Sequence, residues 1–189
     1  MRDQPDNSPL PHAGEAPGES AGKGVQWWLW LALSALVIVL DQGSKHAILS
    51  HFQYGEALEL TSFFELVRAH NQGAAFGLLN EAGGWQRWLF ASIAIGAAIW
   101  AVLLLRRHRQ QKLFCLSLAL IMGGALGNLI DRMSYGYVVD FLDFHWGQNH
   151  FPAFNVADSA ITGGAGLLLL ESFINHRKGR EERPASTGE

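Results

Sequence analysis

Long apolar segments alternate with polar ones along this chain. Trp88 to Leu105 and Leu113 to Ile130 each run for 18 residues without a charged side chain. About 20 apolar residues are enough for a helix to span a bilayer, so both segments are predicted to be transmembrane helices. Two further segments approach or exceed this length and carry a charge near one end, namely Trp27 to Leu49 and Ala153 to Leu170.

A soluble four-helix bundle is the alternative to a membrane protein. Helices of a soluble bundle carry a polar face at helical spacing, and residues 113–130 have none. Tryptophans also gather at the segment ends, as they do at membrane interfaces. The apolar run Trp27 to Leu40 is followed by Asp41 to Lys45 rather than by a small-x-small cleavage motif, so we expect a retained anchor rather than a signal peptide. The fold class is therefore a mainly α, four-helix membrane protein.

Both ends of the chain differ from its middle in composition. Residues 1–24 and 177–189 are rich in Pro, Gly, Ser and charge and nearly devoid of large apolar side chains, so we expect two disordered tails. The tails lower the mean hydropathy to +0.08, although 49% of all residues are hydrophobic. Residues 25–176 are left as the membrane domain.

Lysine and arginine are unevenly distributed about the predicted spans. With four spans, both tails and the 106–112 loop lie on one side, and they hold most of the 14 Lys and Arg residues. Because basic residues favour the cytoplasmic side, we expect both termini there. The segments 50–86 and 131–152 then face the other side of the membrane.

The outer segments contain strand patterns and polar groups. Alternation over 57–61 and strand-forming residues over 63–67 predict a small sheet near the outer interface. At the end of the third span, Asn128 and Arg132 share a helical face. The neighbouring Asp131 either forms an ion pair with Arg132 or has another partner inside the protein, because polar groups at this depth need one.

Two aspartates flank the connection between the third and fourth spans. Those spans leave and enter the membrane on the same side, so Asp140 and Asp158 can meet at the outer interface. Two carboxyl groups in a partly dry site share one proton, which lets one act as general base and the other as general acid. On spacing alone, two separate interfacial aspartates remain the simpler interpretation.

Other chemistries fit the sequence less well. His145, His150 and Asp143 offer zinc ligands, but no fixed metal-binding spacing occurs, so we expect no metal site and treat Asp143 as an ordinary loop acid. The single Cys115 is interpreted as a buried, inert thiol. No basic stripe indicates a nucleic-acid partner. Interfacial charges also mark ion transporters, but the acids gather at one end and no inverted repeat is evident. A third functional class, a structural membrane subunit, would not explain the polar clusters of residues 123–132 and 151–158.

Five short motifs together resemble the lipoprotein signal peptidase family, also called signal peptidase II. They occur in the family's order across residues 27–174: Asp41-Gln42-x-x-Lys45, Asn71-x-Gly73-Ala74-Ala75-Phe76, Gly123-Gly124-Ala125-x-Gly127-Asn128-Leu129-Ile130-Asp131-Arg132, Val138-Val139-Asp140-Phe141 and Phe151-Pro152-Ala153-Phe154-Asn155-Val156-Ala157-Asp158. The resemblance implies a four-helix inner-membrane aspartyl peptidase with a small extracytoplasmic sheet. Such an enzyme removes the signal peptide from prolipoproteins, just before a cysteine that carries a diacylglyceryl group.

The resemblance also implies roles for individual residues. It assigns the catalytic pair to Asp140 and Asp158, and it gives polar roles lining the site to Asn71, Asn128, Arg132 and Asn155. Asp41 and Lys45 match the motif of the first span, where we expect them to support the site. The implied partners are a diacylglyceryl-modified prolipoprotein and membrane lipid, with no cofactor and an active site near the periplasmic face. We expect a monomer.

Overall fold

The computed structural model describes residues 26–73 and 83–181. Helices and strands alternate in groups along this part of the chain. In order, they are α1 (Trp27–His51), β1 (Ala57–Thr61), β2 (Phe64–Asn71), α2 (Gln86–Arg107), α3 (Lys112–Tyr135), β3 (Val138–Trp146), β4 (Asn149–His150) and α4 (Val156–Glu181).

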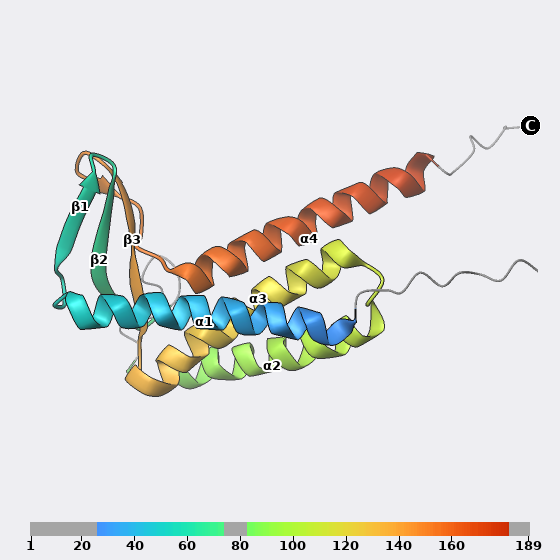
Figure 1. Cartoon of the computed structure of the whole chain (residues 1–189), viewed down its shortest axis with the longest axis horizontal. Helices are drawn as coiled ribbons and strands as arrows, with labels where there is room; N and C mark the ends of the chain where they lie inside the picture. Colours follow the sequence, from blue (N-terminus) through green and yellow to red (C-terminus); the bar gives the residue numbers. More distant parts are fainter. Residues whose placement is uncertain (1–25, 74–82, 182–189) are drawn as a thin grey trace, which may run out of the picture.

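All four helices of the described residues are long and apolar enough to cross a membrane. At 1.5 Å of rise per residue, the shortest of them, the 22-residue α2, spans the roughly 30 Å of a hydrocarbon core. Figure 1 shows the strands at one end of the helices and the α2–α3 connection at the other. The predicted fold class is confirmed.

Helix α3 is the centre of the bundle and packs against α1, α2 and α4. Its glycines make this close packing possible, because small residues let helix backbones approach one another. A Cβ atom on Gly123 would lie 2.8 Å from the carbonyl oxygen of Ser34, and one on Gly127 would lie 2.6 Å from Oδ2 of Asp41. Larger side chains at these positions would push α1 away from α3.

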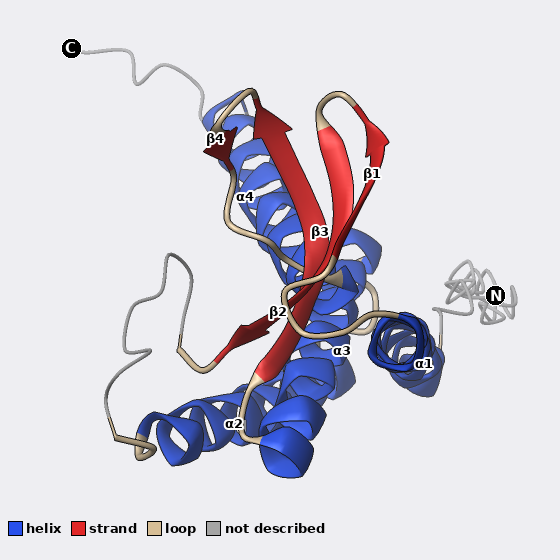
Figure 2. Cartoon of the chain, turned by 90° about the vertical axis from the view of Figure 1, so that its left-hand side faces the viewer, coloured by secondary structure: helices blue, strands red, loops and turns tan. Residues whose placement is uncertain are grey.

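The strands form antiparallel pairs in the order β1-β2-β3-β4. The predicted small sheet is confirmed, and its segments 57–61 and 63–67 correspond to β1 and to the first half of β2. The sequence pattern missed β3 and interpreted Asp143 as a loop acid. Asp143 instead lies within β3, where it pairs with Glu65 of β2. Figure 2 shows β3 alongside β2, in front of the helices.

The first half of β3 is anchored to the helices. Val139 and Phe141 are buried and pack with Ile48, near the end of α1. The backbone N–H of Phe141 donates to the carbonyl oxygen of Phe154, just before α4. Asp140 therefore lies between two buried apolar neighbours, on a strand held against α1 and the start of α4.

The helix α4 reaches farther than the sequence predicts. Residues 177–181, which the composition placed in the C-terminal tail, are helical. Extending an existing helix is easier than starting one, and Arg, Lys and Glu are good helix formers. The predicted tail 1–24 and the motif residues Ala74 to Phe76 lie outside the described residues.

Candidate active site

Asn155 joins the start of α4 to β3 through both atoms of its side-chain amide. Its Oδ1 accepts the backbone N–H of Asp158 at 2.9 Å, which is the hydrogen bond of a helix N-cap. Its Nδ2 donates to Oδ1 of Asp140 at 2.7 Å and to the carbonyl oxygen of Val139 at 3.2 Å. Because each amide atom has partners of the matching kind, the orientation of Asn155 is determined.

Asn128 makes the corresponding link to the second acid. Its Nδ2 donates to Oδ1 of Asp158 at 2.7 Å, and its Oδ1 accepts from the Lys45 ammonium at 2.9 Å. An ammonium group only donates hydrogen bonds, so Lys45 turns the amide NH₂ group of Asn128 toward Asp158. The two asparagines thus bring together the two aspartates singled out in the sequence.

Asp140 is 3% exposed, and its surroundings favour the protonated form. Burial raises the pKa of the Asp140 carboxyl to about 7, and the nearby charge of Asp158 contributes to the increase. Hydrogen bonding to Asn71 and Asn155 and the charge of Lys45 lower this pKa, but burial outweighs them. Near neutral pH, Asp140 is therefore available in both protonation states.

Lys45 is the cation at the centre of a buried network. Its ammonium lies 2.9 Å from Oδ2 of Asp41 and 2.9 Å from Oδ2 of Asp131, and it also donates to Asn128. These contacts use all three of its donors. The side chains of the two acids are fully buried, and that of Lys45 is 2% exposed.

The two acids of this network hold the backbone beside both candidate catalytic aspartates. Oδ1 of Asp41 accepts the N–H of Ala157 at 2.9 Å, next to Asp158. Oδ2 of Asp131 accepts the N–H of Val139 at 3.0 Å, next to Asp140. The carboxylate of Asp41 also lies at the N-terminus of α4, where the helix dipole favours negative charge.

The alternative of an Asp131–Arg132 ion pair is wrong, because Asp131 binds Lys45 instead. Consecutive residues of a helix point in different directions. Sequence reasoning also missed Gln42, whose Nε2 donates to Oδ1 of Asp131 at 2.8 Å and to the carbonyl oxygen of Gly127 at 3.1 Å. The available signal was the proximity of Gln42 to Asp41 and Lys45 in one motif.

Arg132 and Asn71 both contact the backbone of Gly73, just after β2. Nη2 of Arg132 donates to the carbonyl oxygen of Gly73 at 2.9 Å, and its guanidinium lies 4.8 Å from the ring centroid of Phe90. Oδ1 of Asn71 accepts the N–H of Gly73 at 3.0 Å. Arg132 therefore connects the end of β2 to α3 and α2, close to the two aspartates.

Comparison with known proteins identifies the family. The family model described as signal peptidase (SPase) II matches residues 33–174. A lipoprotein signal peptidase of Burkholderia ambifaria (strain MC40-6) is 60% identical over 151 residues, covering 80% of this chain and 91% of the relative. Another, from Burkholderia vietnamiensis (strain G4 / LMG 22486), is 63% identical over 144 residues, covering 76% and 87%. The chain belongs to the signal peptidase II family.

The fold of this chain also resembles solved structures of bacterial membrane enzymes, which is consistent with its membership of a protease family. A bacterial membrane enzyme solved in meso at 2.3 Å resolution superposes with a TM-score of 0.72 at 29% identity, covering 84% of this chain and 94% of that one. A second, solved at 1.9 Å, gives a TM-score of 0.66 at 31% identity, covering 76% and 91%. The architecture of this signal peptidase II chain is thus shared with membrane enzymes.

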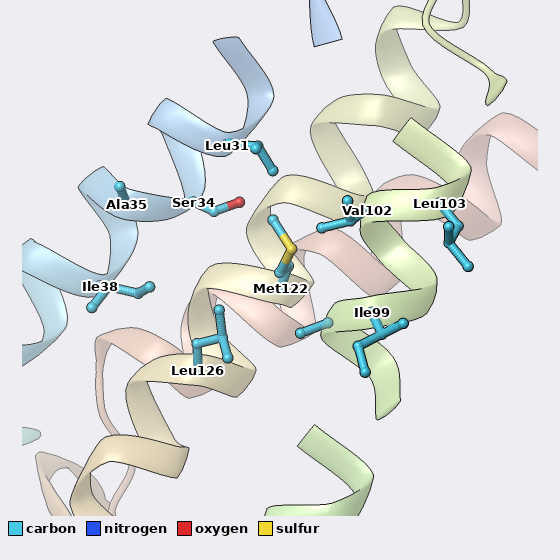
Figure 3. A pocket seen from close by; sticks show the side chains of 10 residues that line it. Leu31, Ser34, Ala35, Ile38, Ile99, Val102, Leu103, Met122 and Leu126 are labelled. Carbon is cyan, nitrogen blue, oxygen red and sulfur yellow. The ribbon is translucent and has the colours of Figure 1, made fainter. Parts of the chain in front are cut away.

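An apolar groove of about 470 Å³ lies elsewhere in this signal peptidase II chain, between α1, α2 and α3. Figure 3 shows its lining, in which Leu31, Ile38 and Val102 are typical members. The lining residue Ser34 already donates from its hydroxyl to the carbonyl oxygen of Ala119 at 2.8 Å. The groove offers no acid–base group, so the polar cluster around Asp140 and Asp158 is the candidate active site.

Proposed function

We propose that this chain is an aspartyl endopeptidase that removes signal peptides from diacylglyceryl-modified prolipoproteins. Asp140 and Asp158 are its catalytic pair. The observation that carries the proposal is the pair of bridging asparagines, Asn155 and Asn128, which hold two carboxyl groups in one buried polar cluster. Because the pKa of Asp140 is raised to about 7, its carboxyl group can act as an acid or as a base at neutral pH.

The reaction begins with one proton shared by the two carboxyl groups. The ionised carboxylate accepts a proton from water as the water oxygen attacks the scissile carbonyl carbon. The protonated carboxyl donates its proton to the carbonyl oxygen, giving a neutral tetrahedral intermediate. The intermediate collapses as one carboxyl group transfers a proton to the leaving nitrogen and the other carboxylate accepts a hydroxyl proton of the intermediate. A free amine and a carboxylic acid result, and the pair again shares one proton.

The surrounding polar groups bind the peptide and stabilise charge. The amide of Asn71 hydrogen-bonds to Asp140, and the guanidinium of Arg132 lies near both aspartates. Both groups lie at the end of β2, where we place the extended peptide. Preorganised donors of this kind stabilise the developing oxyanion in a buried site. The diacylglyceryl group of the substrate stays in the bilayer, and cleavage occurs just before the lipidated cysteine.

The distribution of basic residues supports an orientation in the bacterial inner membrane. Arg106 and Arg107 end α2, and Lys112 begins α3, at the end of the bundle away from the sheet. Basic residues favour the cytoplasmic side. The sheet and the aspartate pair then lie near the periplasmic face and both termini are cytoplasmic. The membrane domain of residues 25–176 acts as a monomer.

The test is cleavage of a diacylglyceryl-modified prolipoprotein by purified variants. Asp140→Asn and Asp158→Asn each remove one acid–base group without changing the size of the side chain, so we expect each to lose activity by about 1,000-fold or more. Glu59→Gln makes the same chemical change on the exposed strand β1 and serves as the control. Full cleavage by either aspartate variant, with correct folding, would overturn the proposal.

A further inference from the structure

A second cluster of titratable side chains lies on the sheet. It contains Glu65 of β2, Asp143 of β3 and His150 of β4, and one ligand atom from each lies within 4.8 Å of the others. Nδ1 of His150 is 3.1 Å from both carboxylate oxygens of Asp143 and 4.0 Å from Oε1 of Glu65. Three neighbouring strands thus direct three metal-ligating groups to one point.

This cluster is separate from the candidate active site. Glu65 and Asp143 are register partners across β2 and β3, so their side chains lie on the same face of the sheet. Side chains alternate between the two faces along a strand. Asp143 is three residues from Asp140 on β3 and therefore lies on the opposite face.

The two carboxylates of the cluster, Glu65 and Asp143, favour the binding of a cation. Like charges directly opposite each other on paired strands are destabilising, and these two side chains are only 18% and 12% exposed. Within residues 26–73 and 83–177, neither carboxylate has a salt bridge to Lys or Arg, and His150 is the ionisable partner. A bound metal ion would neutralise both carboxylates and use the same imidazole nitrogen.

The spacing also matches a particular class of metal. Tetrahedral Zn²⁺ with ligand bonds of about 2.0 Å places its ligand atoms roughly 3.3 Å apart. The 3.1 Å separation of His150 and Asp143 is close to this value, and the 4.0 Å separation of His150 and Glu65 is somewhat longer. One imidazole with two carboxylates suits zinc better than calcium or magnesium, which prefer ligand sets made of oxygen alone.

We propose that Glu65, Asp143 and His150 bind one Zn²⁺ ion, with water as the fourth ligand. The ion connects β2 and β4 to β3, the strand that carries Asp140. From the sequence we expect no metal site, because His145, His150 and Asp143 have no fixed metal-binding spacing. Glu65 lies far from them along the chain and is brought to them only by the sheet.

The test measures zinc binding directly. The full chain is purified in detergent with an affinity tag free of histidine, stripped with a chelator and titrated with zinc sulfate by calorimetry, with bound metal counted by mass spectrometry. We expect one zinc ion per chain, and we expect His150→Gln and Glu65→Gln each to weaken binding by roughly tenfold or more. His51→Gln, which changes an exposed histidine at the end of α1, is the matched control and keeps full affinity.

A second measurement covers the case in which a variant folds poorly. Zinc binds the folded site, so it should raise the unfolding temperature of the wild-type chain and of His51→Gln. The same addition should leave the unfolding temperature of His150→Gln unchanged. No saturable binding by the wild type, or equal affinity in His150→Gln, overturns the proposal. Both readouts are independent of peptide cleavage, so this site can fail while the proposed function stands.

Discussion

Asn155 donates a 2.7 Å hydrogen bond from Nδ2 to Oδ1 of Asp140, while its own Oδ1 caps α4. One fully buried side chain therefore fixes both the start of a helix and the position of an acid on a neighbouring strand. The placement of Asp140 relative to Asp158 depends on the first turn of α4 and on the packing of β3 beside it.

The two roles of Asn155 can be separated by substitution. Serine also caps helices but is too short to keep the hydrogen bond to Asp140, whereas alanine loses both contacts. We expect Asn155→Ser to retain most of the stability and Asn155→Ala to lose about 1 kcal/mol more. Both should reduce peptide cleavage strongly. Because this hydrogen bond lowers the pKa of Asp140, its loss should also move the high-pH limb of the activity profile upward.

Thermal unfolding and single-turnover cleavage at several pH values check these expectations. If Asn155→Ser cleaves as fast as the wild type, with an unchanged pH profile, the bridge to Asp140 has no role in catalysis. If the two variants are equally stable, Asn155 contributes no cap.

The raised pKa of Asp140 predicts a pH-dependent stability. Its ordinary value is 3.8 and its folded value is about 7, so the folded state binds the proton more tightly. The stabilisation is complete below the ordinary value, decreases as pH rises, and is lost above about 7. Asn resembles the protonated acid, so Asp140→Asn should be more stable than the wild type at alkaline pH, by up to about 4 kcal/mol.

Unfolding in detergent at about pH 5 and about pH 8 checks this prediction. The stability difference between Asp140→Asn and the wild type should be larger at the higher pH. Glu59→Gln, on the exposed edge strand, provides the control with no such dependence. A difference that is constant across the range contradicts a raised pKa for Asp140.

Lys45 is the cation shared by two fully buried acids. Lys45→Met leaves Asp41 and Asp131 buried without their cation, and removing one partner of a buried ion network costs about 3–5 kcal/mol. The triple variant Asp41→Asn, Lys45→Met, Asp131→Asn removes all three charges and keeps oxygen acceptors for the N–H groups of Ala157 and Val139. We expect it to recover much of the lost stability.

Thermal unfolding followed by tryptophan fluorescence measures both proteins. A triple variant no more stable than Lys45→Met would indicate that the hydrogen-bond geometry of Lys45, rather than charge balance, is what the fold requires.

Gly127 is needed for the close contact between α3 and α1. A methyl group there would lie 2.6 Å from Oδ2 of Asp41, against the buried network. We expect Gly127→Ala to cost about 1–3 kcal/mol and to reduce activity. Gly96, in the middle of α2, has open space around the position of its missing Cβ atom. Gly96→Ala should be neutral or stabilising, by up to about 1 kcal/mol, because alanine favours helices.

Comparing the unfolding temperatures of the two glycine variants separates packing from helix propensity. Equal effects in both would show that the contact with Asp41 does not limit the approach of the helices.

The local patterns of the sequence predict much of the fold. Long apolar runs predict the helices, and alternation over 57–61 with the strand-forming run after it predicts a small sheet, because each signal is contained in a single segment. The extent of α4 past residue 176 and the strand β3 were missed. Strand β3 is rich in the strand formers Val, Phe and Trp, but its place in the sheet depends on pairing with β2, which lies far away in the sequence.

The sequence by itself determined the membrane class, and it singled out the two candidate aspartates and the polar motifs around them. Only the tertiary structure decided the partners of those groups. Lys45 meets Asn128 across 83 positions of the chain, and Asp41 meets Ala157 across 116. The same holds for Glu65, which reaches Asp143 and His150 only through the sheet. The physical reason is that a buried charge needs a partner, but sequence spacing does not specify which distant residue the folded backbone brings within bonding distance.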